Sequence, residues 1–190
     1  MPLPDAERPR EPLHRRSIEI HGYKRDDGLY DIEGHLVDTK SLDFKLAAGI
    51  RAKGEPIHEM WLRITVDRNL VIVDAAAATD AMPYAGECAT ITPDYRKLVG
   101  LAIRPGYTQK VKELFGGTRG CTHITELCGS IATAAFQTLA GQRVQPTDKK
   151  PFQLDKCHAL ATSSAAVGRY YPKWYTGTEP IEVAGEGDHH

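Results

Sequence analysis

Polar and apolar residues alternate along much of the first half of the chain. The alternation runs through residues 17–23 and 29–38, which a turn with the Asp-Gly hairpin signal separates at residues 25–28. It resumes over residues 57–67, and a mainly apolar run follows over residues 70–75. A period of two is typical of strands with one buried face, and short turns join such strands into antiparallel hairpins. The pattern therefore predicts a meander of at least three antiparallel strands.

Two of these runs separate into faces. In the run over residues 29–38, one face carries Tyr30, Ile32, Gly34 and Leu36. The other face of this run carries Asp31, Glu33, His35 and Val37. In the run over residues 57–67, His58 shares its face with Met60, Leu62, Ile64 and Val66. We therefore expect His58 at the mouth of an apolar surface.

Helical spacing is characteristic of the second half. Residues 93–99 begin with a proline at the first helical position, and residues 107–115 form a second short pattern. The main helix is expected over about residues 122–139, because apolar residues recur there at helical spacing and Gly141 follows as a C-cap. Strands first and helices afterwards predict an α+β fold, an antiparallel sheet of N-terminal strands with C-terminal helices packed on one face.

The chain of 190 residues is long enough to bury a core. We expect a disordered arm over residues 1–13, a single α+β domain over residues 14–176 and a flexible tail over residues 177–190. The formal net charge is -1 and the 24 basic residues are spread along the chain, so nucleic acid is not an expected partner.

No apolar run approaches the roughly 20 residues of a membrane span, and the first sixteen residues lack the apolar region of a signal peptide. A cytoplasmic location without a membrane partner is therefore expected. The sequence leaves open whether the chain forms a homo-oligomer. Reduced thiols are expected at four widely spaced cysteines, Cys88, Cys121, Cys128 and Cys157.

The densest candidate chemistry lies in residues 116–127, Gly-Gly-Thr-Arg-Gly-Cys-Thr-His-Ile-Thr-Glu-Leu. Here a glycine-rich turn leads into a helix N-terminus, which favours a thiolate or a bound anion. His123 and Glu126 share a helix face, so they can form a general base with its orienting carboxylate, two metal ligands, or a plain polar surface. Cys121 can be a nucleophile, a ligand or a small residue in a tight turn.

Other residues can complete such a site if helix and sheet bring His58 to the cleft of His123. His58 and Glu33 would then supply a second acid/base pair, and Arg119 with the helix N-terminus would hold an oxyanion. The residues that we expect to contact an anionic or phenolic substrate are Arg119, Cys121, Tyr84, Tyr23, Arg25 and His35. Ordinary surface and core roles are the alternative for each of them.

Four motifs in order resemble one bacterial family: residues 27–36, 56–60, 80–88 and 116–127. On these motifs the chain is identified as a member of the domain-of-unknown-function family numbered 2889, over about residues 15–142. The resemblance implies relatives that occur near genes for degrading aromatic acids and lignin-derived phenolics. The positions associated with the family motifs are Glu33, His58, Cys88, Cys121, His123 and Glu126.

A looser likeness is architectural. Strands that end near Cys88, followed by a helix that opens with Gly-Cys at Cys121, resemble iron–sulfur scaffold proteins of the IscU and NifU type. In that likeness the two cysteines would match the first two thiols of the scaffolds. The chain departs from the Gly-Cys-Gly-Ser turn of the scaffolds with Gly-Cys-Thr-His, so the likeness concerns the fold only.

Two functions follow as expectations. The first is an enzyme without an organic cofactor that acts on a small aromatic molecule, such as a lignin-derived phenol. It would be a lyase that cleaves a carbon–carbon bond or eliminates, with His123 as the base oriented by Glu126. The second is a metal- or ligand-binding module without turnover. Its zinc or iron ligands would be His58, His123, Glu126 and Cys121.

Overall fold

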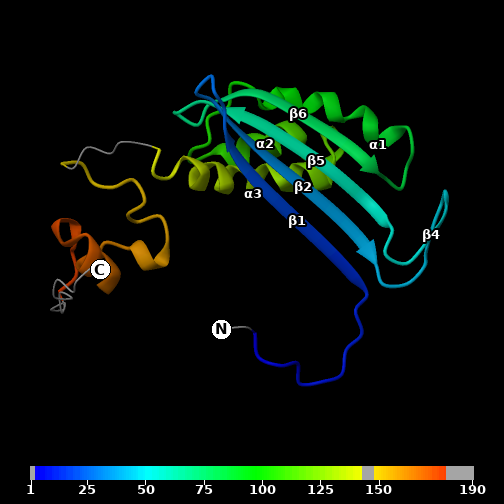
Figure 1. The fold of residues 1–190 in the computed structure, drawn as a ribbon, viewed down its shortest axis with the longest axis horizontal. Helices are drawn as coiled ribbons and strands as arrows, with labels where there is room; N and C mark the ends of the chain where they lie inside the picture. Colours follow the sequence, from blue (N-terminus) through cyan, green and yellow to red (C-terminus); the bar gives the residue numbers. More distant parts are fainter. Residues whose placement is uncertain (1–2, 143–147, 179–190) are drawn as a thin grey trace. The chain divides into compact units, whose positions relative to one another are not determined.

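The computed structural model describes residues 3–142 and 148–178 (Figure 1). The chain divides into two compact units, residues 1–142 and 143–190. The predicted single domain over residues 14–176 spans both units and stays a prediction. Residues 3–13, in the predicted disordered arm, are exposed and form no helix or strand. The predicted tail over residues 177–190 lies outside the described residues from residue 179 onward.

Four antiparallel strands form the sheet of the first unit, in the order β1-β2-β5-β6 (Figure 1). The strands are β1 (His14–Lys24), β2 (Tyr30–Lys40), β5 (Pro56–Val66) and β6 (Ile72–Ala81). The predicted turn between β1 and β2 is formed, with Gly28 at a φ of 84°. A small hairpin between β2 and β5 comprises β3 (Phe44–Leu46) and β4 (Gly49–Arg51). It was not predicted, because strands of three residues are too short to show alternation.

Helices follow the strands, and the α+β class is confirmed. The helices of the first unit are α1 (Glu87–Thr90), the 3-10 helix η1 (Thr92–Leu98), α2 (Tyr107–Phe115), the 3-10 helix η2 (Gly117–Arg119) and α3 (Thr122–Leu139). The predicted ranges of α2 and α3 are confirmed, whereas the helix expected over residues 93–99 is the 3-10 helix η1. The second unit contains η3 (His158–Leu160), α4 (Ala165–Tyr170) and η4 (Pro172–Trp174). Within residues 3–142 and 148–178, no helix has both the length and the apolar character needed to cross a membrane.

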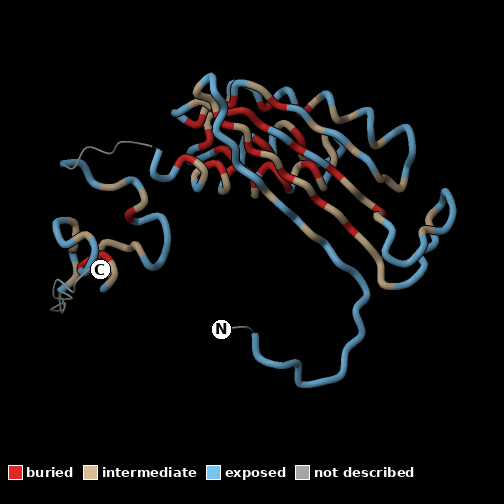
Figure 2. Tube along the Cα trace, in the orientation of Figure 1, coloured by how far each residue is buried: buried red, intermediate tan, exposed pale blue. Residues whose placement is uncertain are grey.

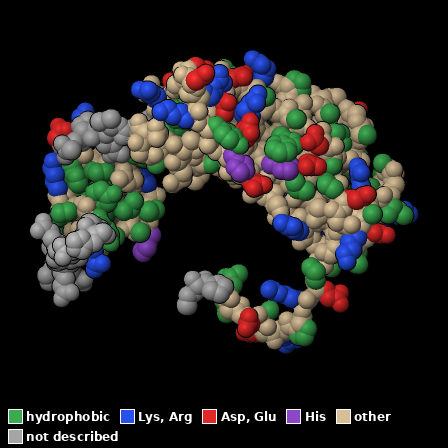
Figure 3. All heavy atoms as spheres, viewed as in Figure 1, with side chains coloured by type: hydrophobic (Ala, Val, Ile, Leu, Met, Phe, Trp, Pro, Cys, Tyr) green, Lys and Arg blue, Asp and Glu red, His purple; other side chains and the backbone are tan. Residues whose placement is uncertain are grey.

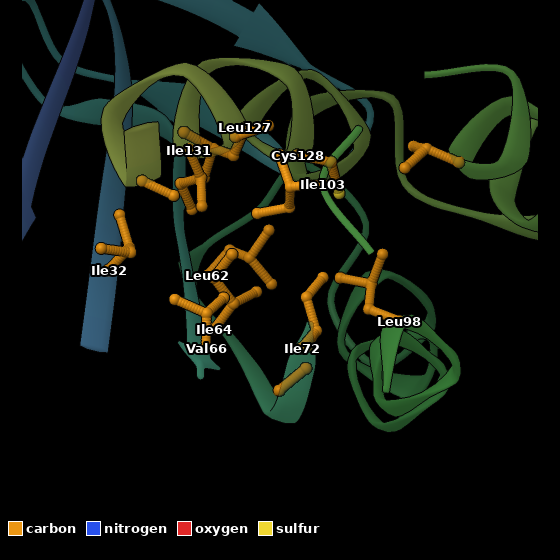
Figure 4. Close-up of a cluster of buried hydrophobic side chains, with 14 of the residues drawn as sticks. Ile32, Leu62, Ile64, Val66, Ile72, Leu98, Ile103, Leu127, Cys128 and Ile131 are labelled. Carbon is orange, nitrogen blue, oxygen red and sulfur yellow. The ribbon is translucent and has the colours of Figure 1, made fainter. Parts of the chain in front are cut away.

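The core lies between the sheet and α3. Figure 2 shows buried positions alternating with less buried ones along β2 and β5, and Figure 4 shows side chains of α3 pointing toward those of the sheet. Fully buried side chains of this layer include Ile32, Leu36, Met60, Leu62, Ile64, Ile124, Leu127 and Ile131. Full burial of one such side chain contributes roughly 1.5–3 kcal/mol, so this layer fixes the helix against the sheet.

Two glycines allow α3 to lie close to the strands. A Cβ atom at Gly22 in β1 would lie 2.0 Å from Thr138 Oγ1, and one at Gly34 in β2 would lie 2.8 Å from Ile131 Cδ1. These contacts place the C-terminal part of α3 beside the start of β2. The first turn of α3 therefore lies beside the other end of β2, where the candidate site is found.

Candidate functional site

Asp38 lies near the end of β2, on the face that packs against α3. Its side chain is only 4% exposed. In the sheet register, Asp38 pairs with His58 on β5 and with Arg16 on β1. His123, in the first turn of α3, reaches the same carboxylate from the helix. Three strands and one helix thus contribute to a single polar cluster.

Two histidines face one oxygen atom of this carboxylate. Asp38 Oδ2 lies 3.2 Å from His58 Nδ1 and 3.5 Å from His123 Nε2. The two imidazole rings stack, with centroids 3.8 Å apart and planes inclined by 28°. The side chains of His58 and His123 are 21% and 20% exposed, so a small molecule or an ion can reach the cluster from solvent.

Arg16 holds the carboxylate from the edge strand. Its Nε donates to Asp38 Oδ1 over 2.9 Å, and its Nη2 donates to Oδ2 over 2.8 Å. His14 Nε2 lies 2.9 Å from the same Oδ1. The Nη1 atom of Arg16 donates to Glu126 on α3. The guanidinium therefore links the sheet to the helix and compensates the charge of Asp38.

The surroundings fix the protonation states of the cluster. Burial alone would raise the pKa of Asp38, but the hydrogen bonds and charges of Arg16 and His14 outweigh it and bring that pKa to about 2. Burial lowers the pKa of His58, against the attraction of Asp38. Burial also lowers the pKa of His123, and the charges of His58 and Arg16 add to the effect. At neutral pH, two neutral imidazoles therefore face an ionised carboxylate.

Tyr95, a buried residue of η1, holds the start of α3. Its hydroxyl donates to the carbonyl of Cys121 over 2.9 Å and accepts from the backbone N–H of Cys121 over 3.0 Å. The same hydroxyl lies 2.8 Å from Thr125 Oγ1. Cys121 Sγ in turn lies 3.8 Å from His123 Nδ1. The chain from Tyr95 to His123 thus positions the imidazole at the cluster.

The structure brings some predicted site residues together in a different arrangement. His58 and His123 converge as expected, with Cys121 beside them. Glu126, however, pairs with Arg16, and the carboxylate beside His123 is Asp38. The interpretation of Glu126 as the group that orients His123 is therefore wrong.

Glu33 does not join His58, because the two side chains lie on opposite faces of the sheet. His58 is the register partner of Asp38, and Glu33 stands an odd number of positions away from Asp38 on β2. The carboxylate of Glu33 instead lies 3.6 Å from Arg63 Nη1. The predicted Glu33–His58 pair is thus not formed.

His35 also lies on the sheet face away from α3, which Figure 3 shows with histidine and hydrophobic side chains among charged ones. Its ring stacks on Trp61 with centroids 3.6 Å apart, and its Nε2 lies 2.9 Å from Glu59 Oε1. The structure therefore separates His35 from the Asp38 cluster by the thickness of the sheet.

The other residues that were predicted to contact a substrate have environments outside the Asp38 cluster. Tyr23, near the end of β1, lies beside His21, with ring centroids 6.3 Å apart. Arg25 pairs with Asp27 in the turn after β1, over 2.7 Å. Arg119 donates to the carbonyl of Glu113 over 3.1 Å, and Tyr84 is exposed in the loop before α1. These four side chains do not gather around His123.

Sequence reasoning missed Asp38, although a signal was present. The period of two that assigns Leu36 to the apolar face assigns Asp38 to it as well. A carboxylate on a buried face needs partners, since an unpaired buried charge is costly. Arg16, at the start of β1, gave no comparable signal, because its pairing with Asp38 depends on the strand register.

Comparison with known proteins gives one match. The model of a family described as "Protein of unknown function (DUF2889)" matches residues 14–137, which is more than half of the chain. No curated protein matches, and no solved structure matches. The likeness to IscU and NifU scaffolds is not supported. Among the described residues, the group that could hold a metal ion is Asp38, His58 and His123, and it includes no cysteine.

Proposed function

The chain belongs to the DUF2889 family, and we propose that it is an enzyme that moves protons on a small organic molecule at Asp38, His58 and His123. The convergence of two histidines and one carboxylate from separate elements carries the proposal. Partly exposed titratable groups with shifted pKa values gather at functional sites more often than on ordinary surfaces. A purely structural ion pair would not need two neutral, solvent-accessible imidazoles.

His58 has the arrangement of a general base. With its proton on Nδ1, the ring donates to Asp38 Oδ2, which leaves the lone pair of Nε2 for a substrate proton. The carboxylate then stabilises the imidazolium that forms, and stacking on His123 holds the ring in place. This arrangement favours His58 as the base, in place of the His123 base expected from the sequence. A positioned base of this kind contributes on the order of 10²–10⁴-fold in rate.

The proposed substrate is a small phenol, and the proposed reaction is that of a lyase. The base removes the phenolic proton, and the electron pair moves through the ring into the side chain. There it expels a leaving group, which takes the proton back from the imidazolium. The reaction involves no net oxidation, so it needs no organic cofactor. The aromatic class follows the implication of the family resemblance.

The proposed location is the cytoplasm. All four cysteines are free thiols: Cys128 is buried, Cys88 and Cys121 are partly exposed, and Cys157 is exposed. Free thiols are typical of reducing compartments.

The test is turnover of 4-hydroxyphenyl compounds with three-carbon side chains, followed by the ultraviolet absorption of a new conjugated double bond. We expect His58→Gln to lower kcat by 10²-fold or more. The control is His21→Gln, because His21 is an exposed histidine on the other sheet face beside a carboxylate, Glu19. Turnover of no compound, or an unchanged kcat in His58→Gln, would contradict the proposal.

A further inference from the structure

We infer that Asp38 Oδ2, His58 Nδ1 and His123 Nε2 form a binding site for one divalent cation of the zinc or iron class. The inference deepens the proposed function and rests on its choice of centre. When Nδ1 of His58 binds the cation, the ring proton stands on Nε2, so a water on the cation would take the place of His58 as the base. It does not depend on the substrate or on the reaction.

The spacing of the three atoms supports a metal site. Imidazole nitrogens and carboxylate oxygens bind zinc at about 2.0–2.2 Å, which separates neighbouring ligands of a tetrahedral site by about 3.3–3.6 Å. Asp38 Oδ2 lies 3.2 Å from His58 Nδ1 and 3.5 Å from His123 Nε2. One ligand atom from each of the three residues lies within 4.8 Å of the others. Each imidazole lone pair lies in its ring plane, so binding one cation through both nitrogens would turn the stacked rings toward a common point.

The hydrogen bonds around Asp38 leave a place for the cation. A carboxylate oxygen has two lone pairs, and Oδ2 already accepts from Arg16 Nη2 and is bonded to His58 Nδ1. His123 Nε2, at 3.5 Å, is left as a third group facing the same oxygen. A cation that binds both imidazoles would replace the bond to His58 and use the lone pair it occupied. Arg16 Nη2 would keep the other lone pair.

The groups behind the three ligands are those of a supported metal centre. Ligating carboxylates are themselves hydrogen-bonded in proteins, and Arg16 makes a two-pronged contact with Asp38. The charge of Arg16 is offset by Glu126, so it does not simply repel a cation. Cys121 Sγ lies beside the second ring nitrogen of His123 and orients that ring. Cys121 and Glu126, both expected as ligands from the sequence, are therefore supporting groups in this inference.

The donor set indicates the class of cation and its role. Two imidazoles and one carboxylate suit zinc or iron better than magnesium or calcium, which prefer oxygen ligands. Three protein ligands leave an open position for water or substrate, as in catalytic zinc sites and in the iron sites of two histidines and one carboxylate. The one-fifth exposure of both histidines provides access to that position.

The test is calorimetric titration of the full chain with Zn²⁺ after removal of metals by a chelator. We expect one Zn²⁺ per chain, and an affinity at least 100-fold weaker in Asp38→Asn and in His123→Ala. Glu126→Gln should weaken binding by less than tenfold, because Glu126 is not a ligand. The matched control is His21→Ala, which removes an exposed histidine from the other sheet face and should bind as the unaltered chain does. Circular dichroism of each variant shows whether it has folded.

Two results would overturn the inference: no stoichiometric binding by the unaltered chain, or unchanged binding in both Asp38→Asn and His123→Ala. Turnover measurements with metal-free protein separate this inference from the proposed function. Turnover that depends on His58 but needs no bound Zn²⁺ would reject the cation's part in the reaction and support the proposed enzyme. Stoichiometric binding of Zn²⁺ without turnover of any phenol would support the metal site and reject the proposed reaction.

Discussion

The imidazole rings of His58 and His123 stack with their centroids 3.8 Å apart, although one belongs to strand β5 and the other to the first turn of α3. Both rings also lie against Asp38 Oδ2. The contact joins the sheet and the helix at a polar point, at the edge of the apolar layer that fixes α3. The position of the candidate site is therefore set by the same packing that forms the core.

The stability of the metal-free protein should rise with pH through the histidine range. Burial lowers the folded-state pKa of His58 and His123 below 6.5, so the unfolded chain binds more protons between the folded values and 6.5. The free energy of unfolding, measured in urea with a chelator present, should therefore increase from pH 5 to pH 7. His58→Gln should show a shallower increase, and an equal increase in both proteins would contradict the assignment.

A second dependence on pH comes from Asp38. Its pKa of about 2 lies below the ordinary value of 3.8, so its stabilising contribution is present above pH 3.8 and is lost as the pH falls toward 2. In Asp38→Asn this acid loss should be smaller. The substitution should also cost about 1–3 kcal/mol at neutral pH, because it removes the carboxylate that the histidines face and leaves Arg16 with Glu126 alone. Urea unfolding at pH 3 and pH 7 measures both effects.

Removal of the Tyr95 hydroxyl should destabilise the start of α3. Tyr95→Phe removes two hydrogen bonds from the backbone of Cys121 at a partly buried position, which should cost about 1–3 kcal/mol. The matched control is Tyr107→Phe, since the buried hydroxyl of Tyr107 has no hydrogen-bond partner among the described residues. That control should be neutral or stabilising. Equal losses in the two variants would show that the hydroxyl of Tyr95 does not hold the helix.

Close packing of α3 on β1 can be tested with two glycines. Gly22→Ala places a Cβ against the branched side chain of Thr138, which should cost about 1–3 kcal/mol. Gly129 lies in α3 itself and has open space around it, so Gly129→Ala should stabilise by about 0.5–1 kcal/mol. Thermal unfolding of both variants gives the comparison. A Gly22→Ala variant as stable as the unaltered chain would contradict this account of the packing.

Arg16 should act as a positioning residue. Arg16→Lys keeps a positive charge but cannot make the two-pronged contact with Asp38 while also reaching Glu126. We expect 10–100-fold weaker binding of Zn²⁺ with an unchanged stoichiometry of one, as is typical when a partner of a ligand is altered. Complete loss of binding in a folded Arg16→Lys variant would mean that the guanidinium does more than orient the carboxylate.

The larger elements of the fold could be predicted because each has a regular apolar pattern. The alternation in β2 and β5 and the helical spacing in α2 and α3 reflect burial of one face, which the sequence records directly. The hairpin of β3 and β4 and the short helix α1 have no buried residue, so their sequences show no regular apolar pattern. Strand β1 begins before the predicted run and β6 ends after it, because backbone pairing continues where the side-chain pattern does not alternate.

The candidate site was only half predictable. His58 and His123 could be found from their place on an apolar face and at a helix start. Their partner Asp38 depends on the register of β2 against β5, and local patterns do not determine that register. Glu126 stands three residues after His123 and so was a plausible partner on the same helix face. The guanidinium of Arg16, on β1, instead binds its carboxylate. Contacts between elements, rather than residue types, decide such pairings.

The cluster of Asp38, His58 and His123 is tested most directly by nuclear magnetic resonance of ¹⁵N-labelled histidine rings in metal-free protein over pH 4–9. If His58 and His123 share one carboxylate, both rings should titrate below pH 6.5. Asp38→Asn should lower both transitions further, because it removes the negative charge that favours the imidazolium of each ring. Two rings that titrate independently of Asp38, at or above pH 6.5, would contradict the existence of the cluster.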